Sequence, residues 1–462
     1  MNFAESLSYL LSLGNEVLAM KLGLDSTEKL LAALGNPQNN FLKIQIAGTN
    51  GKGSTCAFLE AVCLRAGIKT GLNTSPHLIS ITERIRINGE EIGEKDFARH
   101  AARIRKISER LVETGELETV PTFFEQMTAI AVSAFAEAKI ELAILETGLG
   151  GRFDSVTATR AEIAAITPVD YDHQKILGDT LAEIASEKAA IIRETTRKVV
   201  LAQQKPEAAK VILEACEKFN VEPKISDFPF QIVEREKSAN RRGGSGGTAI
   251  LNSESVISGD ASLISVNFQT EKDEYQNVRL SLRGKHQIEN ARVAVLLAEA
   301  LQDDFKISTA DIIEGLQTAT HKGRLEFYKG ILFDGAHNAA GAKALAEYFD
   351  EFIHQPVTLI FGAVRDKDLS EIAKLLFPRA AILILTAPDN PRAVDAVNLY
   401  EDLKEILREV IDTDKVFIAE NVGSAVCLAG DLTGDGGLIC VTGSLYLVGE
   451  AQKVLSESVL ER

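Results

Sequence analysis

The chain has few cysteines, and they form no pattern. Cys56, Cys63, Cys216, Cys427 and Cys440 are scattered and lack Cys-x-x-Cys spacing. This argues against a disulfide framework and against a zinc site. We expect them to be small buried side chains of a protein from a reducing cytoplasm.

Two further absences exclude whole classes of protein. No uncharged apolar run reaches about 18 residues, the length that a membrane-spanning helix needs. Residues 1–20 carry Glu5 and Glu16 and no basic segment, so they predict an amphipathic helix and not a secretory signal.

An excess of basic residues is also missing. The net charge is −16, from 50 basic and 66 acidic residues. A protein of this charge lacks the basic footprint of a general nucleic-acid binder. Small anionic ligands stay compatible with it, because a few local Lys or Arg side chains or a helix N-terminus can hold them.

What the chain does have is the composition of an ordinary soluble globular protein. Its 462 residues are 45% hydrophobic and 25% charged. That length predicts two or three domains. Short apolar segments at 41–48, 141–148, 161–168 and 198–203 alternate with helical patterns such as 54–67 and 123–139. This alternation indicates an α/β fold with a mostly parallel sheet covered on both faces.

A second α/β series starts near Gly330. Its expected strands lie at 331–338, 356–363, 380–388, 415–420 and 437–444. We therefore predict a first domain over 1–317, a hinge over 318–323 and a smaller Rossmann-like domain over 324–462. Residues 238–262 are rich in Gly and Ser and predict a surface insertion within the first domain. A strand-like stretch at 275–286 and a helix over 291–301 follow it.

A phosphate-binding loop is the first chemical motif. AGTNGKGS, residues 47–54, follows an apolar strand and precedes a helix. Its glycines allow a tight turn whose N–H groups face phosphate, Lys52 adds a positive charge, and Ser54 or Thr55 can face Mg²⁺. The first half of the loop is short and Gly53 separates Lys52 from Ser54, so a plain Gly-rich turn is the alternative.

This loop resembles the ATP loop of the Mur ligase superfamily. Within it, the chain is similar to the folylpolyglutamate synthases and the bifunctional dihydrofolate synthases. The motifs that carry this resemblance are, in order, TSPHL at 74–78, TFFE at 122–125, ETGLGGRFDSVT at 146–157, DHQKILGDTLAEIASEKAAII at 172–192, HQIENA at 286–291, GRLE at 323–326 and FDGAHN at 333–338.

The resemblance implies a P-loop ATPase domain followed by a glutamate-ligase domain. The implied reaction joins L-glutamate to the carboxylate of a folate or of dihydropteroate, with ATP consumed and an acyl phosphate formed. ATP would lie between the domains, so closure would complete the site. The implied ATP-binding residues are Gly48, Thr49, Asn50, Gly51, Lys52, Gly53, Ser54, Asn290, Arg324 and Asp334.

A magnesium site is also implied, with Ser75, Glu146 and His173 as ligands. Glu146 stands at the carboxyl end of a strand, where ligands gather in α/β sheets. Without the resemblance, Ser75 is an ordinary Ser-Pro turn residue, Glu146 an exposed carboxylate and His173 a surface histidine. The implied pterin- or folate-binding residues are Thr122, Phe123, Phe124, Glu125, Phe153, Asp154 and Ser155; Phe123 and Phe124 could equally be core.

Lys52, His337 and Lys188 are the candidate catalytic residues. The pattern IASEKAAII alone predicts a solvated lysine at position 188 on an amphipathic helix. The resemblance instead implies that CO₂ carboxylates Lys188, which converts a cation into an anion near the metal. His337 could contact the transferring phosphate or simply begin a helix.

Two alternatives remain at this point. One is another Mur-type amide ligase, although only 47 residues precede Gly48, too few for an N-terminal nucleotide-sugar domain. The other is a non-ligase nucleotide-binding protein, but no NKxD guanine motif is present. We expect small-molecule substrates, no nucleic acid, no membrane, a cytoplasmic location and a monomer.

Overall fold

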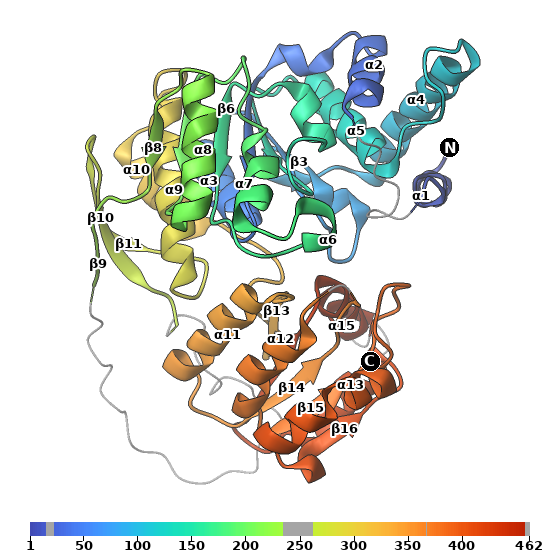
Figure 1. Ribbon diagram of the computed structural model, residues 1–462, viewed down its shortest axis with the longest axis vertical. Helices are drawn as coiled ribbons and strands as arrows, with labels where there is room; N and C mark the ends of the chain where they lie inside the picture. Colours follow the sequence, from blue (N-terminus) through green and yellow to red (C-terminus); the bar gives the residue numbers. More distant parts are fainter. Residues whose placement is uncertain (15–22, 234–261, 366, 458–462) are drawn as a thin grey trace. The chain divides into compact units, whose positions relative to one another are not determined.

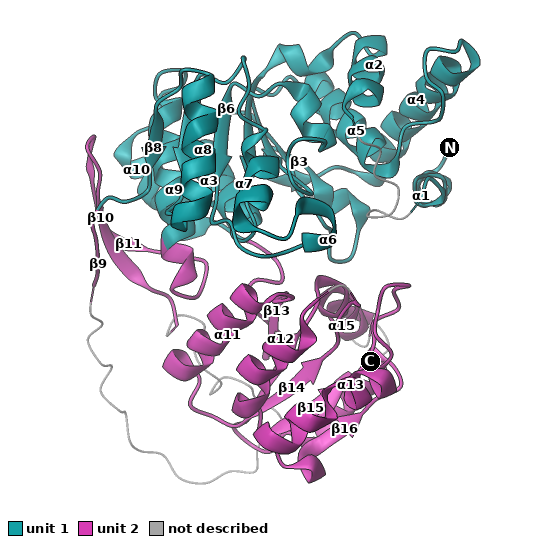
Figure 2. Cartoon of the chain, viewed as in Figure 1, with its two compact units in different colours: residues 1–228, 289–320 teal, residues 229–288, 321–462 magenta. Residues whose placement is uncertain are grey.

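The computed structural model describes residues 1–14, 23–233, 262–365 and 367–457. The chain divides into two compact units, Met1–Phe228 with Glu289–Thr320 and Pro229–Ile288 with His321–Arg462 (Figure 2). The predicted insertion at 238–262 lies, except for Ser262, outside the described residues. The domain boundaries given above stay a prediction.

The first unit is built on an eight-stranded sheet, in the order β4-β3-β2-β5-β1-β6-β7-β8. Six neighbouring strands from β2 to β8 are parallel, while β3 and β4 add an antiparallel edge. The strands are β1 Leu42–Ala47, β2 Thr70–Asn73, β3 Ile85–Ile87, β4 Glu90–Glu91, β5 Leu142–Glu146, β6 Ile163–Ile166, β7 Lys198–Leu201 and β8 Pro223–Ile225. The central strands are apolar because helices cover both faces of the sheet.

The helices of this unit gather in two groups. In Figure 1, α1, α2, α4 and α5 lie near the β3 end of the sheet, and α7 to α10 lie near the β8 end. The helices are α1 Phe3–Ser12, α2 Asp25–Ala33, α3 Lys52–Arg65, α4 Glu94–Glu113, α5 Phe123–Ala138, α6 Gln174–Leu177, α7 Leu181–Ala189, α8 Pro206–Lys218, α9 His286–Leu301 and α10 Thr309–Thr318, with 3-10 turns η1 Pro37–Asn40, η2 Ile81–Arg84 and η3 Ser155–Thr159.

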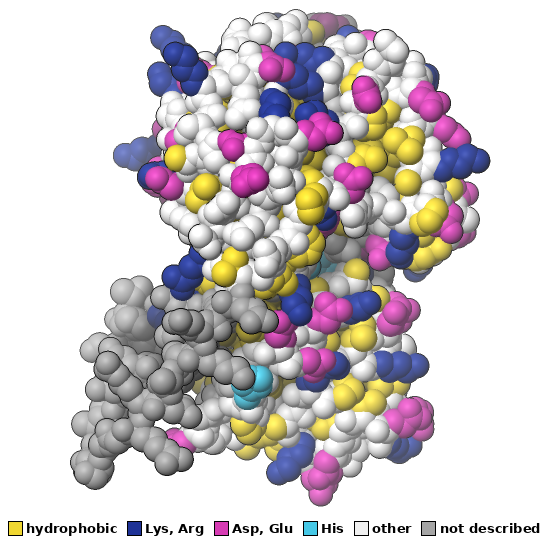
Figure 3. Space-filling model, turned by 90° about the vertical axis from the view of Figure 1, so that its left-hand side faces the viewer, with side chains coloured by type: hydrophobic (Ala, Val, Ile, Leu, Met, Phe, Trp, Pro, Cys, Tyr) yellow, Lys and Arg dark blue, Asp and Glu magenta, His cyan; other side chains and the backbone are white. Residues whose placement is uncertain are grey.

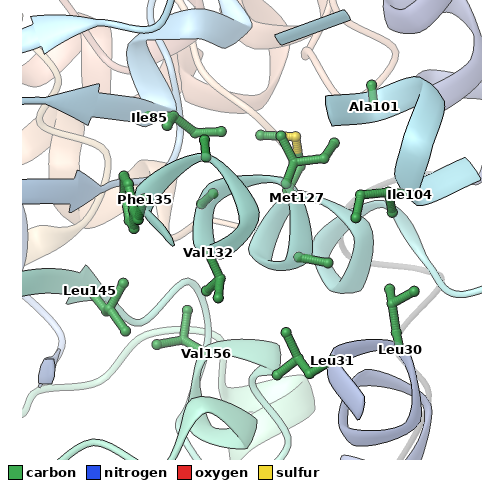
Figure 4. Close-up of a cluster of buried hydrophobic side chains, with 14 of the residues drawn as sticks. Leu30, Leu31, Ile85, Ala101, Ile104, Met127, Val132, Phe135, Leu145 and Val156 are labelled. Atoms are coloured by element: carbon green, nitrogen blue, oxygen red, sulfur yellow. The ribbon is translucent and has the colours of Figure 1, made fainter. Parts of the chain in front are cut away.

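A hydrophobic core surrounds α5. Met127, Val132 and Phe135 of this helix point into a cluster that also contains Leu30 of α2 and Ile85 of β3 (Figure 4). Phe135 is fully buried. The cluster packs along α5, so the first residues of this helix, which include the predicted substrate contacts Phe123, Phe124 and Glu125, are held by the core.

The second unit contains two sheets. The larger has the order β12-β13-β17-β14-β15-β16 and is parallel except at β12, and the smaller is the antiparallel β11-β10-β9. The strands are β9 Phe230–Ile232, β10 Ser265–Gln269, β11 Glu274–Arg279, β12 Glu326–Tyr328, β13 Ile331–Asp334, β14 Val357–Phe361, β15 Ile382–Leu385, β16 Val416–Ile418 and β17 Leu438–Thr442. The helices are α11 Ala339–Phe352, α12 Leu369–Leu376, α13 Ala396–Val410, α14 Val422–Leu432 and α15 Leu445–Glu457, with 3-10 turns η4 Phe377–Arg379 and η5 Thr413–Lys415.

These elements confirm the predicted α/β class and all nine predicted strands, but some boundaries were wrong. The helix expected from residue 291 begins at His286. The helix expected over residues 1–20 ends at Ser12, and Gly14 then has a φ of 107°. Cys427 is exposed, because the buried face of α14 is formed by Val422, Ala425 and Ala429. The other cysteines are buried, and no disulfide joins any of the five.

On the face drawn in Figure 3, acidic and basic side chains are interspersed. Across the residues that the structure describes, none of the helices combines the length and apolarity that a membrane crossing requires.

Candidate active site

The phosphate loop joins β1 to α3 and is shaped by its glycines. Gly48 has a φ of 144° and Gly51 a φ of 87°, in a region that side chains with a Cβ rarely adopt. A Cβ on Gly48 would overlap the hydroxyl of Thr167, and one on Gly51 would overlap Oδ1 of Asn290. The loop therefore packs directly against Asn290, a residue that the sequence predicts to hold ATP.

Backbone contacts fix the first half of the loop. The N–H groups of Thr49 and Asn50 donate to the carbonyl of Pro168, at 3.0 and 3.4 Å. The hydroxyl of Thr49 exchanges hydrogen bonds with the backbone of Asp170, each 3.0 Å long. The loop is thus held in place before any ligand binds, with the N-terminal turn of α3 beside it. The N–H groups of such a turn have no partners within the helix and can receive an anion.

Two lysines converge on one carbonyl oxygen of this loop. Lys52 Nζ donates to the carbonyl of Gly48 at 3.1 Å and to that of Thr49 at 3.1 Å. Lys188 Nζ, from α7, donates to the same Gly48 carbonyl at 2.8 Å. Both amines are thus held at the phosphate loop, and the charge of Lys52 there suits an anion.

Lys188 is buried, with 4% of its surface exposed. The expectation of a solvated surface lysine, drawn from helical periodicity alone, is wrong. Burial, together with the charge of Lys52, lowers the pKa of Lys188 to about 7, while Asp172 and Asp154 oppose the shift. A large fraction of this amine is therefore neutral at neutral pH.

Glu146 and Ser75, two predicted metal ligands, lie side by side. The Ser75 N–H donates to Glu146 Oε2 at 3.0 Å. Glu146 ends β5 and is 7% exposed, so the alternative of an exposed carboxylate is wrong. His173 comes from a separate loop at the start of α6, where its N–H donates to Asp172 Oδ1 at 2.8 Å.

A magnesium ion would fit this donor set only with oxygens from outside the protein. Within the described ranges, no three His, Cys, Asp or Glu side chains converge on a point that could hold a metal. Magnesium commonly takes one or two carboxylates and completes its shell with phosphate and water. One buried carboxylate, Glu146, beside a serine and near a phosphate loop matches that pattern.

Asp154 organises the glycine-rich loop that follows β5. Its Oδ2 accepts hydrogen bonds from the N–H groups of Gly148 and Leu149, at 2.8 and 3.0 Å, and its Oδ1 accepts one from Val156 at 2.9 Å. Burial raises the pKa of Asp154, although these three donors oppose the shift. Both oxygens of this predicted pterin contact therefore already serve the loop backbone.

Arg152 ties the same loop to α7. Its Nε donates to Glu187 Oε1 at 2.7 Å, and its backbone N–H donates to the carbonyl of Glu187 at 2.9 Å. A Cβ on Gly151 would lie 2.7 Å from that same carbonyl. The loop and the helix turn that carries Lys188 are thus fixed to each other. Sequence reasoning missed Arg152, although it stands inside a quoted motif.

The TFFE motif lies at the start of α5, and its residues have different structural roles. Thr122 and Glu125 form a capping box: the Thr122 N–H donates to Glu125 Oε2 at 2.7 Å, and the Glu125 N–H donates to the Thr122 hydroxyl at 3.4 Å. The Thr-x-x-Glu spacing could have revealed this from sequence. Phe123 is 2% exposed and belongs to the core. Phe124 is half-buried.

Phe124 reaches the glycine-rich loop. Its Cε1, the Ser75 hydroxyl and Asp154 Oδ2 all lie within 3.5 Å of the position that a Cβ on Gly148 would take. The Ser155 hydroxyl donates to the Phe124 carbonyl at 3.2 Å and pairs with Thr128. Phe153 is 37% exposed. The structure thus brings Phe124, Asp154 and Ser155 together with the Ser75–Glu146 pair.

Arg84 and His77 are neighbours of this cluster that sequence reasoning missed. Arg84 Nε donates to His77 Nδ1 at 2.7 Å. Burial, followed by the charge of Arg84, lowers the pKa of His77 to about 3, so this histidine is neutral and accepts. The guanidinium carbon of Arg84 lies 5.2 Å from the ring centre of Phe123 and 5.8 Å from that of Phe124.

In the second unit, Asp334 ends β13 and is 7% exposed. Its oxygens accept hydrogen bonds from the N–H groups of Leu325 and Ala336, each 2.9 Å long. Burial raises the pKa of Asp334, and the charge of Arg324 opposes the shift. His337 follows in the same turn, with Nδ1 2.7 Å from the carbonyl of Gly335, and the helix itself is capped by Asn338.

His286 is a further titratable group of this unit that sequence reasoning left without a role. Desolvation, together with the charge of Arg324, lowers its pKa to about 4. Arg324 therefore acts electrostatically on both His286 and Asp334. These two predicted ATP-binding residues, Arg324 and Asp334, lie in one unit, while Asn290 lies in the other.

Two family models match the chain. The Mur ligase middle domain matches residues 46–298, and the Mur ligase glutamate ligase domain matches residues 323–445. The second match excludes the alternative of a non-ligase nucleotide-binding protein.

Individual relatives agree with the family models. The dihydrofolate synthase/folylpolyglutamate synthase of Bacillus subtilis is 34% identical over 94% of this chain and 95% of its own length. The folylpolyglutamate synthase of Lacticaseibacillus casei is 28% identical over 92% of each chain. Among solved structures, Mycobacterium tuberculosis folylpolyglutamate synthase complexed with ADP and AMPPCP matches with a TM-score of 0.82 and 29% identity, over 97% of this chain and 98% of that one. The chain belongs to the Mur ligase family, in the group of the dihydrofolate and folylpolyglutamate synthases.

Proposed function

We propose that this chain uses ATP to join L-glutamate to the carboxylate of a folate or of dihydropteroate. A carboxylate oxygen of the substrate attacks the γ-phosphorus of ATP, which releases ADP and leaves an acyl phosphate. The amine of glutamate then attacks the acyl carbon, loses a proton and expels phosphate. The names of the B. subtilis and L. casei relatives and the nucleotides bound to the M. tuberculosis enzyme support this reaction.

The arrangement at the phosphate loop carries the proposal: Lys52 and Lys188 both donate to the Gly48 carbonyl, beside the N-terminus of α3. A phosphoryl group that approaches this spot meets the charge of Lys52 and the N–H groups of the α3 terminus, which are already in place. Charge that develops on the transferring phosphoryl group is therefore stabilised without reorganisation of the protein. The protein supplies position and charge, and no covalent nucleophile is required.

Ser75, Glu146 and His173 are the residues that would hold magnesium. The ion would neutralise phosphate charge when it is bound. The hydrogen bond from the Ser75 N–H keeps Glu146 Oε2 at the edge of the sheet, beside the phosphate loop, and so prepares the carboxylate for a cation.

The carboxylate substrate would bind along Phe124, Gly148 and Phe153. Phe124 presents a half-buried ring, and Gly148 has no side chain to obstruct a ligand. Thr122, Glu125, Asp154 and Ser155 support this surface from behind through their own hydrogen bonds. Asn290 against the phosphate loop, and Arg324, Asp334 and His337 in the second unit, would bind the nucleotide and its phosphates.

Carboxylation of Lys188 is part of the proposal. A neutral amine attacks the carbon of CO₂, forms an N–C bond and loses a proton, which yields a carbamate anion. The burial that lowers the pKa of Lys188 supplies the neutral amine that this step needs. The product would replace one of the two converging cations with an anion.

The test is ADP release by the purified chain with dihydropteroate and, separately, with tetrahydrofolate, each with and without L-glutamate. We expect release that depends on both the pterin substrate and glutamate, and a product one glutamate longer by mass spectrometry. ADP release that ignores both substrates would refute the proposed function. Comparison of the assay with dihydropteroate and the assay with tetrahydrofolate decides whether one or both substrates are accepted.

A further inference from the structure

Arg84 is a buried cation beside the surface assigned to the aromatic substrate. It ends η2, just before the edge strand β3, and is 2% exposed. Its backbone is fixed, because its carbonyl accepts hydrogen bonds from the Thr74 N–H at 3.1 Å and from Asn73 Nδ2 at 2.9 Å. The guanidinium is therefore placed from a rigid point of the sheet.

The side chain of Arg84 touches two groups from different parts of the chain. Nε donates to His77 Nδ1 at 2.7 Å, which fixes the plane of the guanidinium. Its central carbon lies 5.2 Å from the Phe123 ring centre and 5.8 Å from that of Phe124. The two rings meet edge to face, with centres 5.7 Å apart. A guanidinium over aromatic faces is attracted by the ring quadrupoles, most strongly when water is excluded.

The two phenylalanines differ in what else holds them. Phe123 is anchored in the core of α5, whereas Phe124 is half-buried and reaches Gly148 with Cε1. The orientation of the Phe124 ring is therefore set by Phe123 and Arg84 on the protein side. Its remaining surface is what an aromatic ligand beside Gly148 would meet.

We propose that Arg84 is a positioning residue for the aromatic substrate: stacked on Phe123 and Phe124 and held by His77, it fixes the Phe124 ring beside Gly148. This inference rests on the proposed function, because the ligand whose affinity would depend on Arg84 is the pterin-bearing carboxylate of that reaction. Arg84 acts through Phe124 and takes no part in phosphoryl transfer. A cation beneath this surface also favours an anionic ligand, and the substrate carries carboxylates.

The test compares Arg84→Lys with Arg86→Lys. The control residue, Arg86, lies two positions further along the chain, in the edge strand β3. Its side chain pairs with Glu60 at 3.2 Å and donates to the carbonyl of Gly89. Both changes keep the charge and remove a planar guanidinium. We expect Arg84→Lys to raise the KM and the directly measured Kd for dihydropteroate about tenfold, the size of a desolvated cation–π contact. The KM for ATP and that for glutamate should stay as in the wild type, and Arg86→Lys should leave all three KM values unchanged.

Two additional variants keep the test decisive. Arg84→Met removes the buried charge altogether, so no unpaired charge is left in the interior and the variant should fold. It should show the same rise in the Kd for dihydropteroate. In a Phe124→Leu background, Arg84→Lys should add nothing further, because its effect passes through that ring. A wild-type Kd for dihydropteroate in Arg84→Lys, additive effects in the double variant, or loss of folding in both Arg84 variants would each overturn the inference. A wild-type protein that releases no ADP with its substrates would instead overturn the proposed function, which is a separate outcome.

Discussion

At the scale of single residues, the site depends on which polar groups are buried and what they face. Glu146, Lys188 and Asp334 are nearly excluded from water, and each is held by a backbone group. Asp154 is half-buried and is held by backbone N–H groups as well. Burial of a charged group costs free energy unless hydrogen bonds or opposite charges compensate it. Groups placed in this way cannot relax when a ligand arrives, which is the property that catalysis by preorganised charge requires.

Lys52→Ala should abolish ligation without unfolding the protein. Its amine donates to two carbonyls of the phosphate loop, where its charge would act on the transferring phosphoryl group. We expect turnover to fall at least ~100-fold, the scale seen when one charge-stabilising donor is removed. Steady-state ADP release and circular dichroism check this. Lys29→Ala, at an exposed lysine paired with Asp25, is the control and should behave as wild type. Near-normal turnover of Lys52→Ala would contradict the assigned loop.

Lys188→Ala should be severely impaired, and Lys188→Arg should not rescue it. Arginine keeps the cation and cannot take up CO₂ at neutral pH. Turnover of the wild type and both variants, with a short carboxylic acid added to the Ala variant, measures this. Partial rescue by the acid would support a missing anion. A fully active Ala variant would refute the carbamate.

The stability of the protein should also depend on the pKa of Lys188. That pKa is about 7 in the folded protein, below the ordinary value of 10.5. Between these two pH values the unfolded chain binds more protons at this residue, so the contribution of Lys188 to stability rises with pH. In CO₂-free buffer, we expect the Tm of the wild type relative to Lys188→Met to increase from pH 7 to pH 10. A difference in Tm that stays flat would mean that the amine is charged when buried.

At the scale of helices and loops, the start of α5 is the most informative element. Thr122→Ala should destabilise the protein by about 1 kcal/mol, because it removes the side-chain cap of the helix. Urea unfolding measures this, with Thr180→Ala, the equivalent cap of α7, for comparison. Thr122→Ser keeps the hydroxyl and should keep both stability and the KM for dihydropteroate. A raised KM in Thr122→Ser would show that the threonine methyl touches the substrate.

Elements with regular patterns could be predicted from the sequence, whereas the pairing of distant residues could not. The strands β1, β5, β6 and β7 are near-continuous apolar runs, so their burial follows from composition. The burial of Lys188 could not be foreseen, because helical periodicity does not say what covers the polar face. Arg84 carries no motif of its own, and its contact with Phe123 joins positions 39 residues apart in sequence. The helix cap formed by Thr122 and Glu125 could have been predicted from the Thr-x-x-Glu spacing.

At the scale of the whole molecule, the predicted ATP-binding residues are divided between the two units: Asn290 belongs to the first, and Arg324 and Asp334 belong to the second. The middle-domain match ends at residue 298 and the ligase-domain match begins at 323. The α/β class and the family therefore agree with the expectations drawn from the sequence, while the predicted domain boundaries stay a prediction. A monomeric state and a cytoplasmic location stay predictions.

Residues 238–262 should be dispensable for chemistry. The run RRGGSGG and the low apolar content predict that this segment cannot support a core of its own. Its replacement by a short Gly-Ser turn should leave kcat and all KM values unchanged, as measured by ADP release per folded protein. A loss of activity beyond the loss of soluble protein would show that the segment has a role in the reaction.

The supports of the phosphate loop have a consequence for how the protein is made. The loop itself is complete once residue 54 has been synthesised, but its contacts come from Thr167, Pro168, Asp170, Lys188 and Asn290. A ribosome must therefore translate well over half of the 462 codons before the last support emerges. Until then the nascent chain exposes a glycine-rich segment without its anion-binding shape. Nucleotide affinity should thus be a property that the growing chain acquires late, and we expect N-terminal fragments that stop short of Asn290 to lack it.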